Sequence, residues 1–339
     1  MDHGDKIRAS KNITIDDIAK ELGLSKSTIS RAISGKGRIS EATMLKVKEY
    51  IREHNYKPNV IAKGLAQNKT YNIGVILPAD ANLIEIPFFQ SCLMGICEET
   101  AIQDYDVVVT TVKEDDITFL KRLIHNQKVD GIILTRSLVN DTPAAYLKES
   151  GIPFVVIGSC EDDDIVQIDN NHVEGCSELT SILLMSGCHS LAFIAGNQNH
   201  IVNRNRYAGF VKAFENQKIN MDDSMVFLDV NNNVLIDRAV NQIMKRHIDC
   251  IICSDDLICS RVLAKLNEDN YLVPGDIKVA SFYNNAHLES YNPPVTSLSI
   301  NPKELGITAA KRLIDIISGV TGIQKTWVNY EIVLKRSTK

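Results

Sequence analysis

The stretch TIDDIAKELGLSKSTISRAIS, Thr14 to Ser34, carries two short helical patterns with a glycine between them. In the first pattern, apolar residues recur with the three- and four-residue spacing of an amphipathic helix, at Ile15, Ile18, Ala19 and Leu22. Thr14 is suited to cap this helix, Gly23 supplies a turn, and Ser25 is suited to cap a second helix. The stretch therefore predicts a helix-turn-helix.

The second helix has two different faces. Ile29, Ala32 and Ile33 share one side, whereas the opposite side carries Lys26, Ser27, Ser30 and Arg31. Short hydroxyl groups bond to phosphates and base edges, and lysine and arginine reach guanine acceptors in the major groove of DNA. A third helix is expected over residues 41–54, capped by Ser40 and buried through Met44, Val47 and Ile51.

The charge distribution agrees with this division of the chain. Residues 1–70 hold 14 Lys and Arg against 8 Asp and Glu, and the remaining residues hold 23 against 34. A basic head suits an anionic polymer as its partner, whereas an acidic surface repels phosphate. The charges therefore predict double-stranded DNA as the partner of the head alone.

Residues 14–70 resemble the DNA-binding head of the LacI/GalR family of bacterial transcription regulators. The resemblance implies that Lys26, Ser27 and Arg31 read bases and that Ser25, Thr28 and Ser30 hold phosphates, and Thr14 completes the set expected to contact DNA. It also implies that KPNVIAKGLAQNKT (57–70) is a hinge helix that enters the minor groove, with Leu65 as the apolar wedge and Asn59, Ala62 and Lys63 beside it. Gly64 departs from the family's usual serine. Since glycine weakens a helix, we expect the hinge to be ordered only on its operator.

Beyond Tyr71 the pattern changes to short β-branched runs that alternate with amphipathic stretches. The runs predict strands near residues 71–77, 105–111, 129–134, 153–158, 164–168, 190–196, 224–230, 249–254, 276–282 and 295–300. Alternation of this kind implies parallel sheets with helices on both faces. The predicted fold is thus an all-α helix-turn-helix head and an α/β two-lobed core, which by resemblance is similar to a periplasmic sugar-binding protein.

This interpretation sets the domain boundaries. We expect a DNA-binding domain over 1–57, a hinge helix and linker over 58–70, and an effector-binding and dimerisation core over 71–339. Lobe 1 is expected near 71–168 and 298–322, and lobe 2 near 169–297 and 323–339. The chain would then cross between the lobes more than once.

Ligands of such cores bind at the carboxyl ends of the strands, between the lobes. Candidate effector-binding residues stand at several of these ends: Phe88, Phe89, Thr135, Arg136, Arg206, Asp255, Asp256, Tyr283 and Asn284. Some have structural alternatives, because Phe88 and Phe89 also suit a core, Arg206 suits an ion pair, and Asp256 suits a helix cap. Tyr283 and Asn284 replace acidic residues of the family pattern, and the family's pocket tryptophan is absent near residues 230–232. Carbohydrate is the effector class that the resemblance implies.

Enzymatic and metal chemistry find no support in the sequence. No nucleophile elbow, P-loop, zinc-protease or dinucleotide-binding motif occurs. Cys250 and Cys253 form a C-x-x-C, but strand alternation sends their thiols to opposite faces. The eight cysteines mostly lie in apolar runs, which suits reduced thiols. We expect no catalytic residues, no metal and no cofactor.

The sequence therefore predicts a homodimeric transcriptional regulator, a repressor of carbohydrate-utilisation genes, whose core binds a sugar or a related small molecule. With neither an export signal nor a membrane-spanning run, we expect it in the cytoplasm without a membrane partner. Two alternatives stay open: a metabolite-binding module or enzyme tethered by a DNA-binding head, and a constitutive architectural DNA binder. These three functions are distinguished by whether binding of the effector changes the affinity for DNA.

Overall fold

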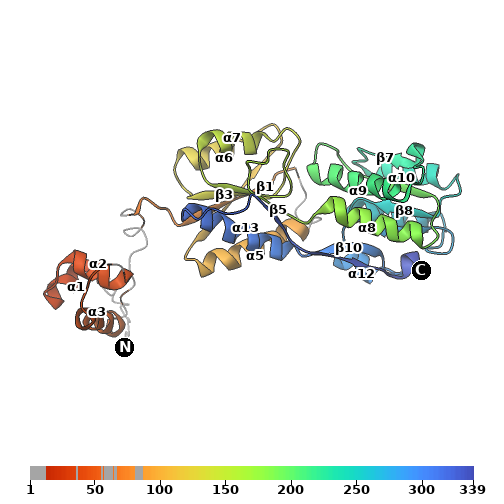
Figure 1. The fold of residues 1–339 in the computed structure, drawn as a ribbon. Coiled ribbons are helices and arrows are strands. Elements are labelled where there is room, and N and C mark those ends of the chain that lie inside the picture. The colour runs from red at the N-terminus through yellow and green to blue at the C-terminus, as the bar shows by residue number, and fades with distance from the viewer. Residues whose placement is uncertain (1–12, 36, 55, 57–63, 65–66, 81–86) are drawn as a thin grey trace, which may run out of the picture. The chain divides into compact units, whose positions relative to one another are not determined.

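A computed structural model describes residues 13–35, 37–54, 56, 64, 67–80 and 87–339 (Figure 1). The chain divides into two compact units, residues 1–69 and 70–339. The first is the head and the second is the core. The helices of the head and the ten predicted strands lie within a few residues of the limits that the sequence pattern predicts.

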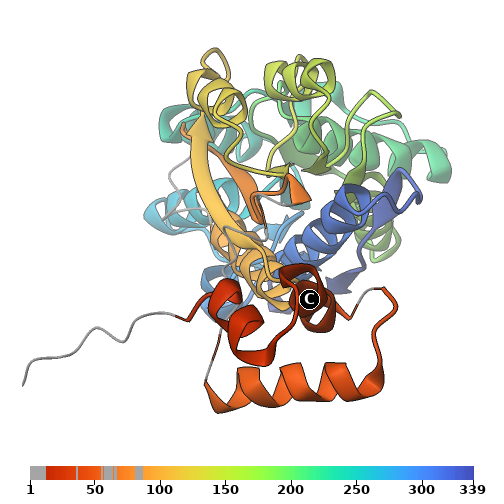
Figure 2. The same cartoon turned by 90° about the vertical axis from the view of Figure 1, so that its left-hand side faces the viewer.

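The head consists of α1 (Ile15–Leu22), α2 (Lys26–Ser34) and α3 (Glu41–Glu53), which Figures 1 and 2 show grouped together. Thr14, Ser25 and Ser40 cap the three helices, as predicted, and Gly23 ends α1 with a φ of 65°. A left-handed residue at this position favours glycine, because it has no Cβ to clash. A small apolar core holds the bundle together, with Ile18, Ala19, Ile29, Ala32 and Val47 buried.

Lobe 1 of the core is built on a six-stranded sheet of order β11-β5-β4-β3-β1-β2. Its strands are β1 (Asn72–Pro78), β2 (Asp106–Val112), β3 (Gly131–Leu134), β4 (Phe154–Ile157), β5 (Gln167–Asp169) and β11 (Lys325–Trp327). All neighbouring pairs are parallel. One face of the sheet packs on α5 (Pro87–Ile102) and α13 (Pro302–Ile317), and the other on α6 (Thr118–His125) and α7 (Thr142–Ser150) (Figure 1).

Lobe 2 repeats this plan with the strand order β12-β10-β9-β8-β6-β7. Its strands are β6 (Leu191–Ile194), β7 (Val226–Phe227), β8 (Cys250–Cys253), β9 (Lys278–Ser281), β10 (Thr296–Ile300) and β12 (Tyr330–Val333). Only β10 and β12 pair antiparallel. Helices α8 (His172–Met185) and α9 (Ile201–Gln217) cover one face, and α10 (Asn233–Ile243) and α11 (Asp256–Glu268) cover the other. Short helices complete the lobe: η1 (Asp223–Met225), α12 (Ala286–Ser290) and η2 (Arg336–Thr338).

The chain passes between the lobes three times, after β5, after β10 and after β11. Two of the expected lobe limits were wrong. The whole of β10 belongs to lobe 2, because it pairs with β9 and β12 and buries Leu298 there, whereas lobe 1 was expected to begin at residue 298. Conversely, β11 extends the sheet of lobe 1 by pairing with β5, although 323–339 had been expected in lobe 2.

The cysteine motif lies as the strand alternation predicts. Cys250 is buried with α8 and α9 on one face of the sheet, and Cys253 is buried with α10 and α11 on the other. The described part of the chain has no group of three or more His, Cys, Asp or Glu side chains placed to hold a metal ion. Nor does it contain a helix that is long and apolar enough to cross a membrane.

Candidate functional sites

The outward face of α2 is exposed as the sequence predicts. Lys26, Ser27, Ser30 and Arg31 are open to solvent, while Ile29 and Ala32 face the core of the head. Thr28 is half-buried. The helix thus presents a slim, hydrogen-bonding and cationic ridge of the kind that enters a major groove.

Hydroxyl groups organise the start of this ridge. The Ser25 hydroxyl accepts a hydrogen bond from the Thr28 backbone N–H at 3.1 Å and lies 2.8 Å from the hydroxyls of both Ser27 and Thr28. Thr14 is committed to α1, because its hydroxyl donates to Asp17 at 2.6 Å in a capping box. Ser25 and Thr14 therefore have structural roles besides any contact with phosphate.

Lys26 forms an ion pair within the head. Its Nζ lies 2.5 Å from Asp16 Oδ1, and the lysine side chain is 67% exposed. Because an exposed ion pair contributes only up to about 1 kcal/mol, Lys26 can exchange Asp16 for a DNA acceptor at little cost. The predicted hinge contacts Asn59, Ala62, Lys63 and Leu65 lie outside the described residues. Gly64 and Gln67, which are described, are helical.

The core contains a cleft of about 210 Å³ between its lobes, at the carboxyl ends of the strands of both sheets. Residues at or just after the ends of β1, β3, β4 and β5 line it from lobe 1, and residues after β8 and β9 line it from lobe 2. Eight of the nine candidate effector residues meet there: Phe88, Phe89, Thr135, Arg136, Arg206, Asp255, Asp256 and Tyr283.

Asn284 is the candidate that does not line the cleft. Its amide donates to Glu289 Oε1 at 2.8 Å. The preceding residue, Tyr283, does line the cleft. The Asn284 amide is thus directed to Glu289 on α12, outside the lining of the cleft.

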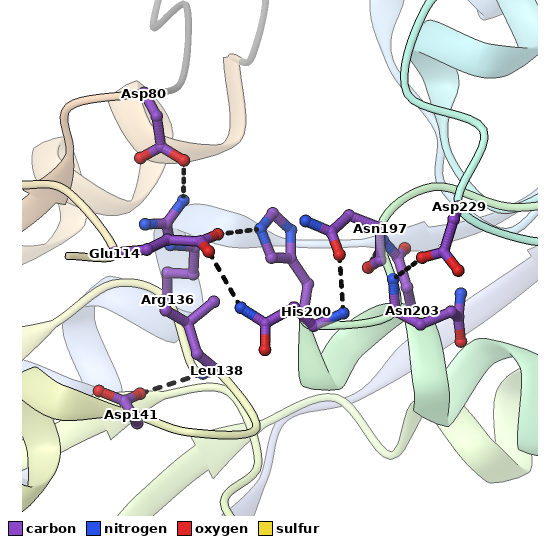
Figure 3. Close-up of polar contacts among 11 residues, drawn as sticks. Asp80, Glu114, Arg136, Leu138, Asp141, Asn197, His200, Asn203 and Asp229 are labelled. Carbon is purple, nitrogen blue, oxygen red and sulfur yellow. Dashed lines mark hydrogen bonds and ion pairs between the residues drawn. The ribbon is translucent and has the colours of Figure 1, made fainter.

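Two lining residues already have firm partners. The Thr135 hydroxyl donates to the Ile76 carbonyl at 2.8 Å, and Arg136 donates to Asp80 Oδ2 at 2.8 Å. The charge of Arg136 is thereby compensated within lobe 1 (Figure 3). These two residues line the cleft with part of their hydrogen-bonding groups already used within lobe 1.

Arg206 on α9 differs from Arg136. It is only 8% exposed, and among the described residues it has no ion-pair partner and its Nε has no hydrogen-bond acceptor. A buried guanidinium without a partner is costly. The structural ion pair considered for Arg206 is therefore not formed, and its donors are left for a ligand.

Asp255 and Asp256 have different hydrogen-bond partners. Asp255 caps α11, because its Oδ1 accepts from the Ile258 N–H at 2.9 Å. Asp256 is buried and accepts from Asn285 Nδ2 at 2.5 Å. Burial first, and then the charge of Asp255, raise the pKa of Asp256 to about 6. Asp256 can thus donate or accept a hydrogen bond near neutral pH.

Aromatic rings form part of the wall. Phe88 meets Phe89 and Tyr283 edge-on, with ring centroids 5.4 Å and 6.3 Å away. Phe89 is buried in the core of lobe 1, whereas Phe88 is half-buried. Burial and the neighbouring Asp256 carboxyl raise the pKa of Tyr283, so its hydroxyl stays protonated. An apolar wall beside polar groups suits a ligand with both apolar faces and hydroxyls.

Several lining residues were missed by the sequence analysis: Ser137, Gly158, Asp169, His172, His200 and Asn203. Asp169 is the last residue of β5, so the rule that ligands bind at the carboxyl ends of strands would have found it. His172 had no such signal, because a lone histidine at the start of a helix is an ordinary feature.

A polar network joins the two lobes beside the cleft (Figure 3). Glu114, which follows β2, accepts from Asn199 Nδ2 at 3.0 Å and lies 3.3 Å from His200 Nε2. The Val139 N–H also donates to the Asn199 carbonyl at 3.0 Å. Burial first, and then the charge of Arg136, lower the pKa of His200. Glu114 is thus a lobe 1 side chain held by lobe 2.

A helix-turn-helix head followed by a two-lobed core with a polar cleft is the architecture of a DNA-binding transcriptional regulator. Residues 14–59 match the family model for bacterial regulatory proteins of the lacI family, and residues 70–333 match the model for periplasmic binding proteins and the sugar-binding domain of the LacI family. The chain belongs to the LacI family, as its sequence pattern predicted.

Similar proteins agree with this assignment. The HTH-type transcriptional regulator MalR of Staphylococcus xylosus is 35% identical over 91% of this chain and 92% of its own. A structure described as a probable maltose operon transcriptional repressor from Staphylococcus has a TM-score of 0.74 at 26% identity, covering 80% of this chain and 99% of its own. The complex of the regulator CelR with cellobiose has a TM-score of 0.73 at 24% identity, covering 96% and 99%, which shows the shared fold.

Proposed function

We propose that this protein is a homodimeric repressor whose affinity for its operator is set by a neutral sugar bound between the lobes. The observation that carries this proposal is the buried Arg206, which has no ion-pair partner among the described residues and lines the same cleft as Asp256 and the ring of Phe88. A guanidinium and a carboxyl recognise neighbouring hydroxyls, and an aromatic ring covers the apolar face of a pyranose.

The charges of the cleft favour an uncharged ligand. The lining contains two arginines, and Arg136 is already paired with Asp80. Three aspartates, Asp169, Asp255 and Asp256, also line the cleft. A phosphorylated sugar would bring its negative charge toward these carboxyl groups, which costs free energy in a partly buried site. The names of relatives point to glucose disaccharides as first probes, since one is called a maltose operon repressor and another was solved with cellobiose.

In this proposal Lys26, Ser27 and Arg31 read bases, and the hinge around Leu65 enters the minor groove. Two heads must meet two half-sites, which requires a symmetric dimer. The sugar acts by binding one arrangement of the lobes more tightly than the other, and it shifts the operator equilibrium only by that difference. The protein acts in the cytoplasm, without a membrane partner and without catalysing a reaction.

Titration of the full chain tests the proposal. We expect maltose or cellobiose to bind by isothermal titration calorimetry and to change the affinity for a pseudo-palindromic operator measured by fluorescence anisotropy. Replacement Arg206→Met should weaken sugar binding about 10- to 100-fold, since a buried hydrogen bond to a charged group is lost. Arg238→Met on α10 is the matched control, because Arg238 is exposed and does not line the cleft.

The outcomes separate the proposal from its alternatives. A sugar that binds without changing operator affinity would indicate a tethered binding module, because the two sites would not be coupled. Operator binding that no small molecule alters would indicate an architectural DNA binder. Equal losses in the Arg206 and Arg238 variants would contradict the assignment of the cleft.

A further inference from the structure

His172 begins α8, immediately after the chain has passed from β5 of lobe 1 into lobe 2. The side chain lines the cleft and is only 5% exposed. Within the described part of the chain, its Nδ1 is buried and has no hydrogen-bond partner. Buried polar atoms are nearly always hydrogen-bonded, so an unpartnered one in a cleft needs an explanation.

The other ring nitrogen of His172 is held in place. Its Nε2 lies 3.4 Å from Asp169 Oδ1, and Asp169 in turn accepts from the Ser159 hydroxyl at 2.6 Å and from the Asn170 N–H at 2.8 Å. Burial alone would raise the pKa of Asp169, but His172 and these hydrogen bonds lower it. An ionised carboxylate only accepts hydrogen bonds, so the proton facing it belongs to Nε2.

The position of this proton determines whether Nδ1 donates or accepts a hydrogen bond. With the proton of a neutral ring on Nε2, the lone pair of Nδ1 is available to a donor in the cleft. Arg206, whose Nε also lacks a partner, stands on the neighbouring helix α9 and lines the same cleft. The helices α8 and α9 are held close at Gly209, where a Cβ would stand 2.5 Å from the Val173 carbonyl oxygen. Among the described residues, two tightly packed helices thus bring an acceptor on His172 and a donor on Arg206 to the cleft, and neither atom has a hydrogen-bond partner.

We propose that His172 is an effector-contacting residue that accepts a hydrogen bond from a ligand hydroxyl on Nδ1, with Asp169 and Ser159 as positioning residues. This inference rests on the proposed function, since it requires a hydroxylated ligand in the interlobe cleft. It adds a specificity requirement, because the ligand must present a hydroxyl to His172 as well as an acceptor to Arg206. A ligand that lacks this hydroxyl leaves Nδ1 buried and unpartnered.

The test compares variants of the full chain by calorimetry with maltose and cellobiose as probes. His172→Phe keeps a planar ring of similar size and removes both nitrogens, so we expect sugar affinity to fall by about tenfold or more. His172→Asn places an amide group close to the position of Nδ1 and should restore binding to within about threefold of wild type. His287→Phe is the control, since His287 is exposed on α12 and does not line the cleft.

A spectroscopic measurement separates ligand contact from a structural role. In protein labelled with ¹⁵N-histidine, the Nδ1 resonance of His172 should move upfield when the sugar saturates the cleft, because its lone pair gains a hydrogen bond. Asp169→Asn should weaken sugar binding, and the double variant with His172→Phe should bind no more weakly than His172→Phe alone. Thermal unfolding without sugar checks that each variant is folded.

The outcomes for the two proposals differ. If wild type binds a sugar and His172→Phe binds it equally well, this inference is overturned and the proposed function stands. Loss of affinity in both His172→Phe and His172→Asn, with an unmoved Nδ1 resonance, would also overturn it in favour of a packing role. If wild type binds neither sugar and neither shifts the Nδ1 resonance, the proposed function and this inference both fail.

Discussion

Asp256 combines burial with a carboxyl neighbour, and this gives the stability of the protein a defined dependence on pH. The pKa of Asp256 is about 6 in the folded chain against an ordinary value of 3.8. Between these values the folded state binds more protons than the unfolded state, so stability falls as pH rises. Asp256→Asn removes the ionisation. We expect wild type to lose up to about 3 kcal/mol relative to the variant between pH 4 and 6.5.

Urea unfolding of both proteins across this pH range measures the effect. The difference between the two free energies of unfolding should grow with pH and level off above about pH 6.5. A constant difference would mean that Asp256 ionises normally. The prediction concerns the unliganded protein, since a bound sugar adds its own stabilisation.

Arg31 is a second side chain whose role can be tested on its own. It is exposed on the outward face of α2, in the position from which the family resemblance expects base contacts. Arg31→Ala should cost about 1–3 kcal/mol of operator binding and reduce discrimination between operator and random DNA. Lys48→Ala on α3 serves as the control, because it removes an exposed charge outside the recognition helix. Equal losses on operator and random DNA would assign Arg31 to phosphate contact instead.

Individual site residues were predictable where a chemical type coincided with a strand end. Thr135, Asp255, Asp256 and Tyr283 all met this condition and all line the cleft. Asn284 met it too, but its amide donates to Glu289 and does not line the cleft. His172 could not be found in this way, because its significance lies in a buried Nδ1 that has no hydrogen-bond partner among the described residues, which only the folded structure reveals.

Elements were predictable in proportion to their burial. All ten strands expected from β-branched runs form, and eight of them are interior strands, which are apolar throughout in a parallel sheet. The run at 224–230 yields only a two-residue strand, β7, at the edge of its sheet. The edge strands β11 and β12 were missed, since half-exposed strands such as Lys325–Trp327 carry no continuous apolar run. Missing β11 also misplaced the last crossing between the lobes.

Helices α5 and α13 cross unusually closely, and this contact can be tested. A Cβ on Gly306 would stand 2.1 Å from the Cys92 carbonyl oxygen, and one on Gly95 would stand 2.1 Å from the Lys303 carbonyl oxygen. Since backbone atoms cannot move aside cheaply, Gly306→Ala should destabilise lobe 1 by at least about 1–3 kcal/mol. Gly275→Ala is the control, because its nearest neighbour would be at 3.4 Å. Equal melting temperatures for the two variants would contradict the close packing.

The arrangement of the two lobes is where sequence patterns say least, because the contacts between the lobes join residues that are distant along the chain. Glu114 is the clearest case, since Asn199 and His200 hold its carboxylate more than 80 positions along the chain. If these contacts favour the arrangement of the lobes that binds the sugar, their loss imposes a cost on binding. Glu114→Ala should then raise the Kd for sugar by up to about tenfold, as expected for a partly exposed charged contact.

The matched variant Glu149→Ala removes an exposed carboxylate from α7, outside this network, and should leave sugar affinity unchanged. The affinity of the Glu114→Ala protein for its operator should also be measured without sugar. If Glu114 acts only through the arrangement of the lobes, its replacement must change sugar affinity and operator affinity through the same shift between the two arrangements. A Glu114→Ala protein that binds sugar more tightly than wild type would mean that the network opposes binding. The same carboxylate would then stabilise the arrangement of the lobes from which the sugar is excluded.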